Sequence, residues 1–311
     1  MTLKEAFALG DAIGSHRDTL LLLEEATGWT QTQLHLNLNS VNSSENSISA
    51  EAAQAFLCML EQRRQHVPVQ YILKQWEFMG LPMYCTGVLI PRADTEVLVE
   101  QAVSFVQNLS NLKKLSINSE NKPLAVLDIC TGSGCIAIAM AHFYTICTAN
   151  QTYSHTKELL SEDLLSKDLQ ITAVDIDPNA LSVAQKNAIL NNVAGQITFL
   201  CSDLLAEVHG RFDCITANPP YIPTKDIEGL AEEVRLHEPL QALDGGLDGL
   251  DFYRRIIPSC RKYLRPGGAI FLEIGVEQAE PVTDMFCKHN FSDIAVITDL
   301  LGRARVVRAS V

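Results

Sequence analysis

The chain has 311 residues, 47% of them hydrophobic, and a formal net charge of −13. This length and composition predict a globular protein with a substantial core, arranged as one large domain or two modest ones. The acidic balance argues against a protein whose main partner is a nucleic-acid backbone, and without a run of 18 apolar residues no transmembrane helix is expected.

The N-terminal segment and the cysteines indicate a cytoplasmic protein. Residues 1–14 contain Glu5 and Asp11 and lack a basic stretch ahead of an apolar one, so no signal peptide is predicted. The nine cysteines are scattered without a C-x-x-C pair, which favours reduced thiols over a disulfide framework. Neither a metal site nor a membrane partner is expected.

Residues 1–75 are predicted to form a small helical domain. A helix is expected over 16–27, ending at Gly28, and a second one begins after Ser49, a good N-cap followed by Glu51 in the first turn. Apolar residues then recur at i, i+3, i+4 and i+7, the spacing of an amphipathic helix. Because the region has no catalytic pattern, we expect it to bind a partner.

A linking β-hairpin is predicted over 76–92, where Gly and Pro interrupt short apolar runs, and a second domain over 93–311. In this domain, strands that are apolar nearly throughout alternate with helices, which predicts an α/β parallel sheet covered on both faces. The polar stretch 148–170 is interpreted as an insertion in the first crossover. The strands are expected at 124–129, 171–176, 197–202, 212–217 and 269–274, followed by an antiparallel pair at 292–298 and 304–310.

A glycine-containing loop follows the first strand of this domain. Asp128 ends the strand, and the run Cys130, Thr131, Gly132, Ser133 and Gly134 leads into a helix. Glycines between a strand and a helix N-terminus let backbone N–H groups face a ligand. A lone G-x-G is weak evidence, so the interpretation depends on the residues that end the following strands.

Acidic residues end the next two strands. Asp175 is placed to accept both hydroxyls of a ribose. Asp177 competes for that role, but Asp177 followed by Pro178 is better explained as a helix N-cap with proline at the first helical position. At the end of the third strand, Asp203 can meet an adenine amino group and Leu204 can cover its ring, although a purely structural turn stays open for this pair.

The fourth strand delivers the run Asn218, Pro219, Pro220 and Tyr221 at its carboxyl end. The two prolines remove backbone donors and stiffen the chain, so the turn is rich in acceptors and ends in an aromatic ring. Ligands of open parallel sheets bind at the carboxyl ends of the strands. A plain turn would explain the prolines but not their position on this strand, so a single crevice is predicted here.

These motifs carry a resemblance. Strand–DxCTGSG–helix, AVD and NPPY together resemble the seven-stranded, class I S-adenosylmethionine-dependent methyltransferases with a Rossmann-like sheet, and NPPY is typical of those that methylate planar nitrogen. Residues 69–100 and 218–256 are similar to the HemK/PrmC family, the release factor N5-glutamine methyltransferases. The resemblance covers about residues 16–309 and departs at Lys74, Ala93 and Cys130, where that family has glycine, proline and glycine.

The resemblance implies an enzyme that methylates the glutamine of the Gly-Gly-Gln motif in peptide chain release factors, its protein partners. The Asn218 side-chain oxygen and the Pro219 carbonyl would accept the two amide N–H groups, and Tyr221 would lie against the amide plane. No direct nucleic-acid binding is expected, and the N-terminal helices become the release-factor-binding domain. The catalytic residues are then Asn218, Pro219 and Tyr221, and the substrate contacts come from Asn218, Pro219, Pro220 and Tyr221.

The implied cofactor is S-adenosyl-L-methionine, with S-adenosyl-L-homocysteine as product. The charged residues Arg92, Asp94 and Glu96 are expected to line the cofactor side of the crevice, and Glu273 to border it. Cofactor contacts are expected from Cys130, Thr131, Gly132, Ser133, Gly134, Asp175, Asp203, Leu204 and Asn218.

Three other functions fit the sequence less well. A nucleic-acid amino-group methyltransferase shares the planar NH₂ chemistry but normally carries a basic recognition domain. The N5-glutamine methyltransferases of a ribosomal protein carry an R-S-P-I-type run where this chain has RADTE. A non-enzymatic cofactor-binding scaffold would require a broken NPPY motif, and the motif is intact.

Overall fold

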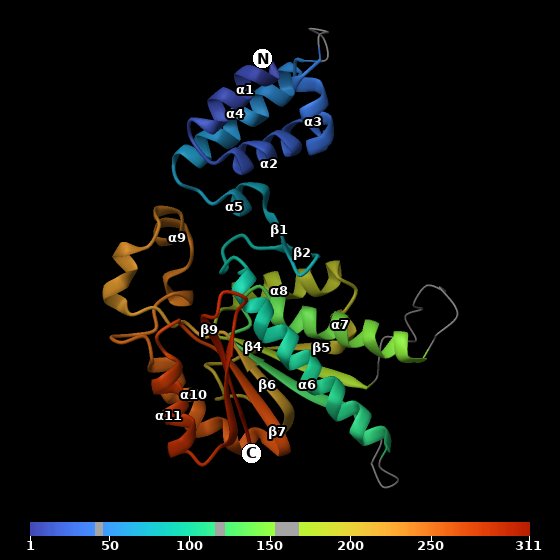
Figure 1. Cartoon of the computed structure of the whole chain (residues 1–311), viewed down its shortest axis with the longest axis vertical. Coiled ribbons are helices and arrows are strands. Elements are labelled where there is room, and N and C mark those ends of the chain that lie inside the picture. The colour runs from blue at the N-terminus through green and yellow to red at the C-terminus, as the bar shows by residue number, and fades with distance from the viewer. Residues whose placement is uncertain (41–45, 116–121, 153–167) are drawn as a thin grey trace. The chain divides into compact units, whose positions relative to one another are not determined.

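The computed structural model of the chain describes residues 1–40, 46–115, 122–152 and 168–311 (Figure 1). These residues form two compact units. The first comprises residues 1–75 together with 230–238, and the second comprises 76–229 and 239–311. In the described part of the chain, none of the helices combines the length and hydropathy needed to cross a membrane.

The first unit is a helical bundle built on well-capped helices. Ser49 accepts a hydrogen bond from the Ala52 N–H at the start of α4, as its N-cap position predicts. Thr2 and Thr30, whose role was not predicted from sequence, form capping boxes with Glu5 and Gln33 at two further helices. The helices are α1 (Leu3–Asp11), α2 (His16–Thr27), α3 (Gln31–Leu38), α4 (Ala50–Arg64) and α5 (Val69–Leu73).

The segment 230–238, far away in sequence, completes this unit. It contains the short helix α9 (Glu232–His237). Arg63 of α4 donates to Asp18 of α2 at 2.9 Å and to Glu233 of α9 at 2.6 Å, so one guanidinium ties three helices together. The bundle core is separate from those of the second unit, and its largest fully buried side chains are Phe56, Leu3, Leu22, Leu23 and Leu34.

The segment 76–92 was predicted as a hairpin, and the structure has a shorter one, formed by β1 (Gln75–Phe78) and β2 (Leu81–Tyr84), so residues 85–92 lie beyond it. Met79 and Gly80 form its two-residue turn and both have positive φ, which matches the right-handed twist of the paired strands. The buried side chain of Asn187 exchanges two hydrogen bonds with the backbone of Tyr84 and also donates to the Ser133 carbonyl at 2.9 Å. One amide thereby connects the hairpin to the glycine loop.

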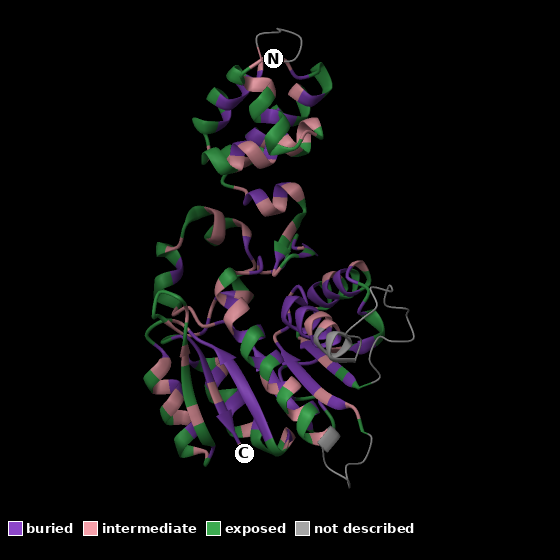
Figure 2. Ribbon diagram, turned by 45° about the vertical axis from the view of Figure 1, so that its right-hand side comes forward, coloured by how far each residue is buried: buried purple, intermediate pink, exposed green. Residues whose placement is uncertain are grey.

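The second unit contains the seven-stranded sheet, and the predicted α/β fold is confirmed. The order is β5-β4-β3-β6-β7-β9-β8, parallel except for β9, which pairs antiparallel with β7 and β8. Central strands are buried along most of their length (Figure 2) because helices cover both faces. The strands are β3 (Leu124–Ile129), β4 (Leu169–Asp175), β5 (Ile197–Cys201), β6 (Phe212–Ala217), β7 (Leu264–Glu273), β8 (Ser292–Thr298) and β9 (Ala304–Ser310).

Helices cover both faces of the sheet (Figure 1), and a layer of apolar side chains on each face holds them there. One layer packs α6 (Glu96–Leu115), α7 (Cys135–Thr152) and α8 (Pro178–Leu190) through residues such as Leu98, Met140 and Ala188. The other packs α10 (Asp251–Cys260) and α11 (Ala279–Lys288) through residues such as Tyr253 and Phe286. This arrangement leaves the carboxyl ends of the parallel strands for a ligand.

Several element bounds differ from expectation. The expected insertion at 148–170 falls partly on α7, which continues to Thr152, while residues 153–167 lie outside the described part of the chain. Strand β7 begins at Leu264 rather than at residue 269 and runs through a Pro-Gly-Gly stretch. Glycine is needed there because a Cβ on Gly268 would lie 3.0 Å from the Asp213 carbonyl oxygen of β6.

Candidate active site

A cavity of about 300 Å³ lies at the carboxyl ends of β3, β4 and β6. The glycine loop forms one wall, residues 87–92 another, and the start of α10 a third. Of the residues predicted from sequence for the loop and the NPPY turn, Gly134, Pro219 and Tyr221 are outside the lining. Those that line the cavity are Cys130, Thr131, Gly132, Ser133, Asp175, Asp203, Leu204, Asn218 and Pro220.

A buried acid fixes the glycine loop. Asp128 accepts hydrogen bonds from the Thr131 hydroxyl of the loop at 2.6 Å and from the Thr216 hydroxyl of β6 at 2.8 Å. Burial raises the pKa of Asp128 to about 7, while the two hydroxyls oppose the shift. The glycine loop and the strand that leads to Asn218 are therefore held by the same carboxyl group.

The loop itself requires positive φ at three positions. Gly132 and Gly134 satisfy this without strain, whereas Cys130 adopts a φ of 59°, which residues other than glycine rarely do. Burial raises the pKa of the Cys130 thiol, so it stays neutral and is not a nucleophile. A Cβ on Gly134 would lie 2.9 Å from the Ala184 Cβ, so this glycine serves the packing of α7 against α8.

Asp175 ends β4 and faces the cavity, but its carboxylate also holds backbone. Its Oδ2 accepts from the Gly132 N–H at 2.8 Å and its Oδ1 from the Asp177 N–H at 3.0 Å. Asp177 caps α8, as expected, by accepting from the Asn179 N–H, and Pro178 occupies the first turn. Asp175 therefore lies between the loop and the helix cap, where carboxylate oxygens can also accept hydroxyl groups.

Replacing Asp175 with alanine is expected to weaken S-adenosylmethionine binding by about 1–3 kcal/mol, the scale of a lost hydrogen bond to a charged acceptor. Asp177 also lines the cavity, so Asp177→Ala tests the competing assignment: as the cap of α8 it should cost about 1 kcal/mol of folding stability and leave cofactor affinity unchanged. Calorimetric titration and thermal unfolding of both variants separate the two effects. Unchanged cofactor affinity in Asp175→Ala would contradict the expectation that Asp175 accepts the ribose hydroxyls.

The third acid, Asp203, already forms an ion pair within the protein. Asp203 Oδ2 lies 2.6 Å from Arg255 Nη2, an ion pair between half-exposed side chains. The turn also has a structural component, because the Ser202 hydroxyl donates to the Leu204 carbonyl at 3.2 Å. Phe252 and Arg255, both from α10, line the cavity beside Asp203 and were not foreseen. No local pattern marks them, since they lie about 50 residues downstream.

The NPPY turn leaves β6 with its polar groups directed by neighbours. Asn218 Nδ2 donates to the Thr95 hydroxyl oxygen at 3.2 Å. The Tyr221 carbonyl accepts from Gln278 Nε2 at 2.9 Å, and the same nitrogen donates to the Gly249 carbonyl at 3.1 Å. Because Gln278 is buried and its Oε1 accepts from the Gly275 N–H, its orientation is fixed.

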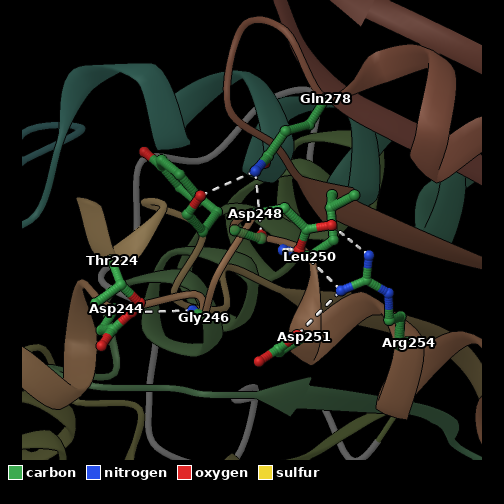
Figure 3. Close-up of polar contacts among 10 residues, drawn as sticks. Thr224, Asp244, Gly246, Asp248, Leu250, Asp251, Arg254 and Gln278 are labelled. Carbon is green, nitrogen blue, oxygen red and sulfur yellow. Dashed lines mark hydrogen bonds and ion pairs between the residues drawn. The ribbon is translucent and has the colours of Figure 1, made fainter. Parts of the chain in front are cut away.

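Residues 244–251, here called the 244–251 loop, run alongside the NPPY turn (Figure 3). Asp244 accepts from the Thr224 hydroxyl at 2.7 Å and from the Gly246 N–H at 2.9 Å, and Asp248 pairs with Arg254. Glycines allow the loop to approach closely, since a Cβ on Gly249 would lie 2.3 Å from the Tyr221 carbonyl oxygen. Neither Gln278 nor the support that the 244–251 loop gives to the NPPY turn was identified from sequence.

Gly249→Ala tests whether the 244–251 loop supports the NPPY turn, and Gly267→Ala is the matched control. Gly267 has a φ of +77°, nearly the same as +76° at Gly249, but no atom lies within 4 Å of its added Cβ. Gly267→Ala should therefore show only the backbone cost, about 1–2 kcal/mol. Gly249→Ala should add an overpacking cost of about 1–3 kcal/mol and slow turnover, as measured by denaturant unfolding and kinetics. Equal effects of Gly249→Ala and Gly267→Ala would contradict a supporting role for the 244–251 loop.

The charged residues near the hairpin are distributed differently from expectation. Arg92 lines the cavity, and so does Thr95, but Asp94 and Glu96 do not. Asp94 instead forms an ion pair with Arg305 of β9 at 2.8 Å, outside the cavity lining. Glu96 is the first residue of α6. Glu273 is not in the lining either, because it is buried at the end of β7.

Comparisons with known proteins agree with this geometry. The family model "PrmC N-terminal domain" matches residues 6–73, and "Methyltransferase small domain" matches residues 159–247. The release factor glutamine methyltransferase of Geobacter sulfurreducens is 38% identical over 93% of this chain and 87% of its own. That of Moorella thermoacetica is 35% identical over 98% of this chain and 97% of its own. The chain belongs to the release factor glutamine methyltransferase family.

Membership makes the chain an enzyme with a methyltransferase domain. Among solved structures, the hMettl16 catalytic domain superposes with a TM-score of 0.50 at 15% identity, covering 87% of this chain and 86% of that one. This likeness concerns the fold alone. Together with the strand order, it places the second unit in the class I methyltransferase fold.

Proposed function

We propose that this methyltransferase transfers a methyl group from S-adenosyl-L-methionine to the side-chain N5 nitrogen of the glutamine in the Gly-Gly-Gln motif of peptide chain release factors, leaving S-adenosyl-L-homocysteine. The observation that carries the proposal is the position of the NPPY turn, which brings Asn218 and Pro220 into one cavity with Asp175 and Asp203. Family membership supports the same substrate class. The site of action is the cytoplasm, where release factors work.

The cavity suits S-adenosylmethionine. Carboxylates at the ends of β4 and β5 offer acceptors for ribose hydroxyls and an adenine amino group, and Leu204 and Phe252 offer apolar cover for a ring. At Gly132 no atom lies within 4 Å of an added Cβ, so a ligand can approach the loop backbone. When bound there, S-adenosylmethionine supplies an electrophilic methyl group.

The chain's own residues then act on the glutamine amide, whose nitrogen is a poor nucleophile because its lone pair is delocalised into the carbonyl. Asn218, in the cavity lining, offers its Oδ1 to one amide N–H, and the carbonyl of Pro219, which is next to it but outside the lining, is proposed to accept the other. Together the two acceptors direct the nitrogen lone pair toward the methyl group. As that nitrogen becomes positive, both hydrogen bonds strengthen, so the turn favours the transition state over the ground state. The prolines add no competing N–H donors. After methyl transfer, the positively charged amide nitrogen loses one of its own N–H protons.

The proposal is tested by incubating the protein with isotopically labelled S-adenosylmethionine and purified release factors. Peptide mass spectrometry should place the label on the glutamine of the Gly-Gly-Gln motif, and a release factor with that glutamine replaced by alanine should stay unlabelled. Ribosomal proteins and structured RNA serve as competing substrates. Label on either of these, with none on release factors, would contradict the proposal.

A further inference from the structure

Glu273 is a buried carboxylic acid beside the NPPY turn that the mechanism so far does not use. It ends β7 and is 1% exposed. Within the described parts of the chain, its Oε2 atom has no hydrogen-bond partner. An incompletely satisfied buried carboxylate is costly, and such groups cluster at functional sites.

The neighbours of Glu273 connect it to the catalytic turn. Strands β6 and β7 pair in parallel with Ala217 opposite Leu272, so Asn218 and Glu273, the next residues along, lie side by side. The Thr95 and Asn218 side chains both lower the pKa of the Glu273 carboxyl, which burial raises. Asn218 Nδ2 in turn donates to Thr95 Oγ1 at 3.2 Å. The three side chains come from three different elements: the turn before α6, the end of β6 and the end of β7.

The direction of these hydrogen bonds is what matters. A threonine hydroxyl both donates and accepts, so Thr95 alone would tolerate either orientation of the Asn218 amide. An ionised carboxylate only accepts. Toward an ionised Glu273, the Thr95 hydroxyl can serve only as a donor, which leaves the Thr95 oxygen to accept from Asn218 Nδ2. Asn218 Oδ1 is then the atom presented to the substrate amide.

We propose that Glu273 is a positioning residue that acts through Thr95 to fix the Asn218 amide with its oxygen toward the substrate. The inference rests on the proposed role of Asn218 in methyl transfer. A flipped amide would present an NH₂ group to the glutamine nitrogen, and no acceptor would then strengthen its interaction as positive charge develops.

The ionisation of Glu273 provides an independent signature. Burial raises its pKa to about 7, Asp94 raises it further, and Arg305, Thr95 and Asn218 oppose the shift. Because the native state holds this proton more tightly than the unfolded chain, stability contributed by Glu273 falls as pH rises from about 4.5 to 7. The other titratable groups that interact with Glu273 are Cys135, Tyr221 and Tyr253.

Glu273→Gln keeps the size of the side chain and removes its charge. The amide of glutamine can donate to Thr95, so the Asn218 orientation is no longer specified. We expect kcat to fall at least tenfold, while the Kd for S-adenosylmethionine and the KM for release factor change less than threefold. Because a costly buried charge is removed, Tm at pH 8 should stay equal or rise. Glu277→Gln, an exposed neighbour, is the matched control and should match wild type in every measurement.

A double-mutant cycle identifies the route of the effect. In an Asn218→Ala background, Glu273→Gln should cause no further loss, because the residue it positions is gone. In the wild type, the Asn218 side-chain NH₂ resonances should shift with a midpoint near pH 7, and this titration should vanish in Glu273→Gln. The NMR measurement needs no turnover, so it decides the inference even if release factors are not the substrate.

Thr95 supplies a second pair of variants in case Glu273→Gln fails to fold. Thr95→Val should lose activity like Glu273→Gln, and Thr95→Ser should retain it because the hydroxyl is kept. Glu273→Gln turnover within twofold of wild type, an additive cycle, or a fully active Thr95→Val would each overturn the proposal. Failure of the proposed function would be visible in the wild type itself, whereas failure of this inference is confined to the variants.

Discussion

Asn218→Ala should lower kcat by about 10²–10³-fold, the loss observed when a hydrogen bond that strengthens in a transition state is removed. Asn218 is the residue of the NPPY turn whose side-chain oxygen is proposed to accept an N–H group of the substrate amide. With alanine there, the nitrogen is no longer oriented and its developing charge is no longer stabilised. Single-turnover kinetics with saturating cofactor and release factor measure this step directly.

Cofactor binding should change much less than turnover in the same variant. The glycine loop, Asp175 and Asp203 lie on other strands and keep their contacts. Asn179→Ala, at an exposed asparagine in the first turn of α8, provides a matched control and should behave as wild type. Near-normal turnover by Asn218→Ala would remove this residue from the mechanism.

The sheet could be predicted from sequence because its signals are local. Each central strand is a short apolar run bounded by turn residues, and β3 and β6 begin and end where the pattern indicated. The cap at Asp177 is equally local, since Asp followed by Pro specifies a helix start within two residues. Motifs at strand ends then converge because parallel strands share one carboxyl edge.

Side-chain contacts across long sequence separations were not predictable. Gln278 meets the Tyr221 carbonyl from 57 residues away, and Arg255 meets Asp203 from 52 residues away. Asp94 was expected at the crevice, but β9 brings Arg305 close enough to pair with it. Such outcomes depend on tertiary packing, which periodicity within one element does not record.

The helical region shows the same limit. Helix α3 presents a single buried residue, Leu34, so its amphipathic pattern is too weak to identify, although Thr30 and Gln33 form a capping box. Residues 230–238 join this unit through contacts between distant parts of the chain, among them the pairing of the Arg63 guanidinium with the Glu233 carboxylate 170 residues later. Nothing near either residue in the sequence indicates that pairing.

Removing residues 1–75 should separate catalysis from substrate choice. The helical unit has its own core, distinct from the two apolar layers on the sheet, so residues 76–311 should still bind S-adenosylmethionine with nearly unchanged Kd. A glutamine side chain offers the cavity few distinguishing groups, so selectivity for one glutamine requires remote contacts whose binding energy orients the amide. We therefore expect kcat/KM for release factor to fall by about 10²-fold or more.

Two controls decide what such a loss means. A short peptide containing Gly-Gly-Gln lacks the remote contacts, so the fragment and the full chain should methylate it at the same slow rate. The fragment also leaves 230–238 without its helical partners. Arg63→Ala combined with His66→Ala in the full chain breaks the ion pairs of both residues to Glu233 and Glu232, and so measures that contribution with the helices still present. If this double variant reproduced the whole loss, positioning of 230–238 rather than release-factor binding by the helices would explain it. Undiminished methylation of release factor by the fragment would contradict any role of the helices in substrate choice.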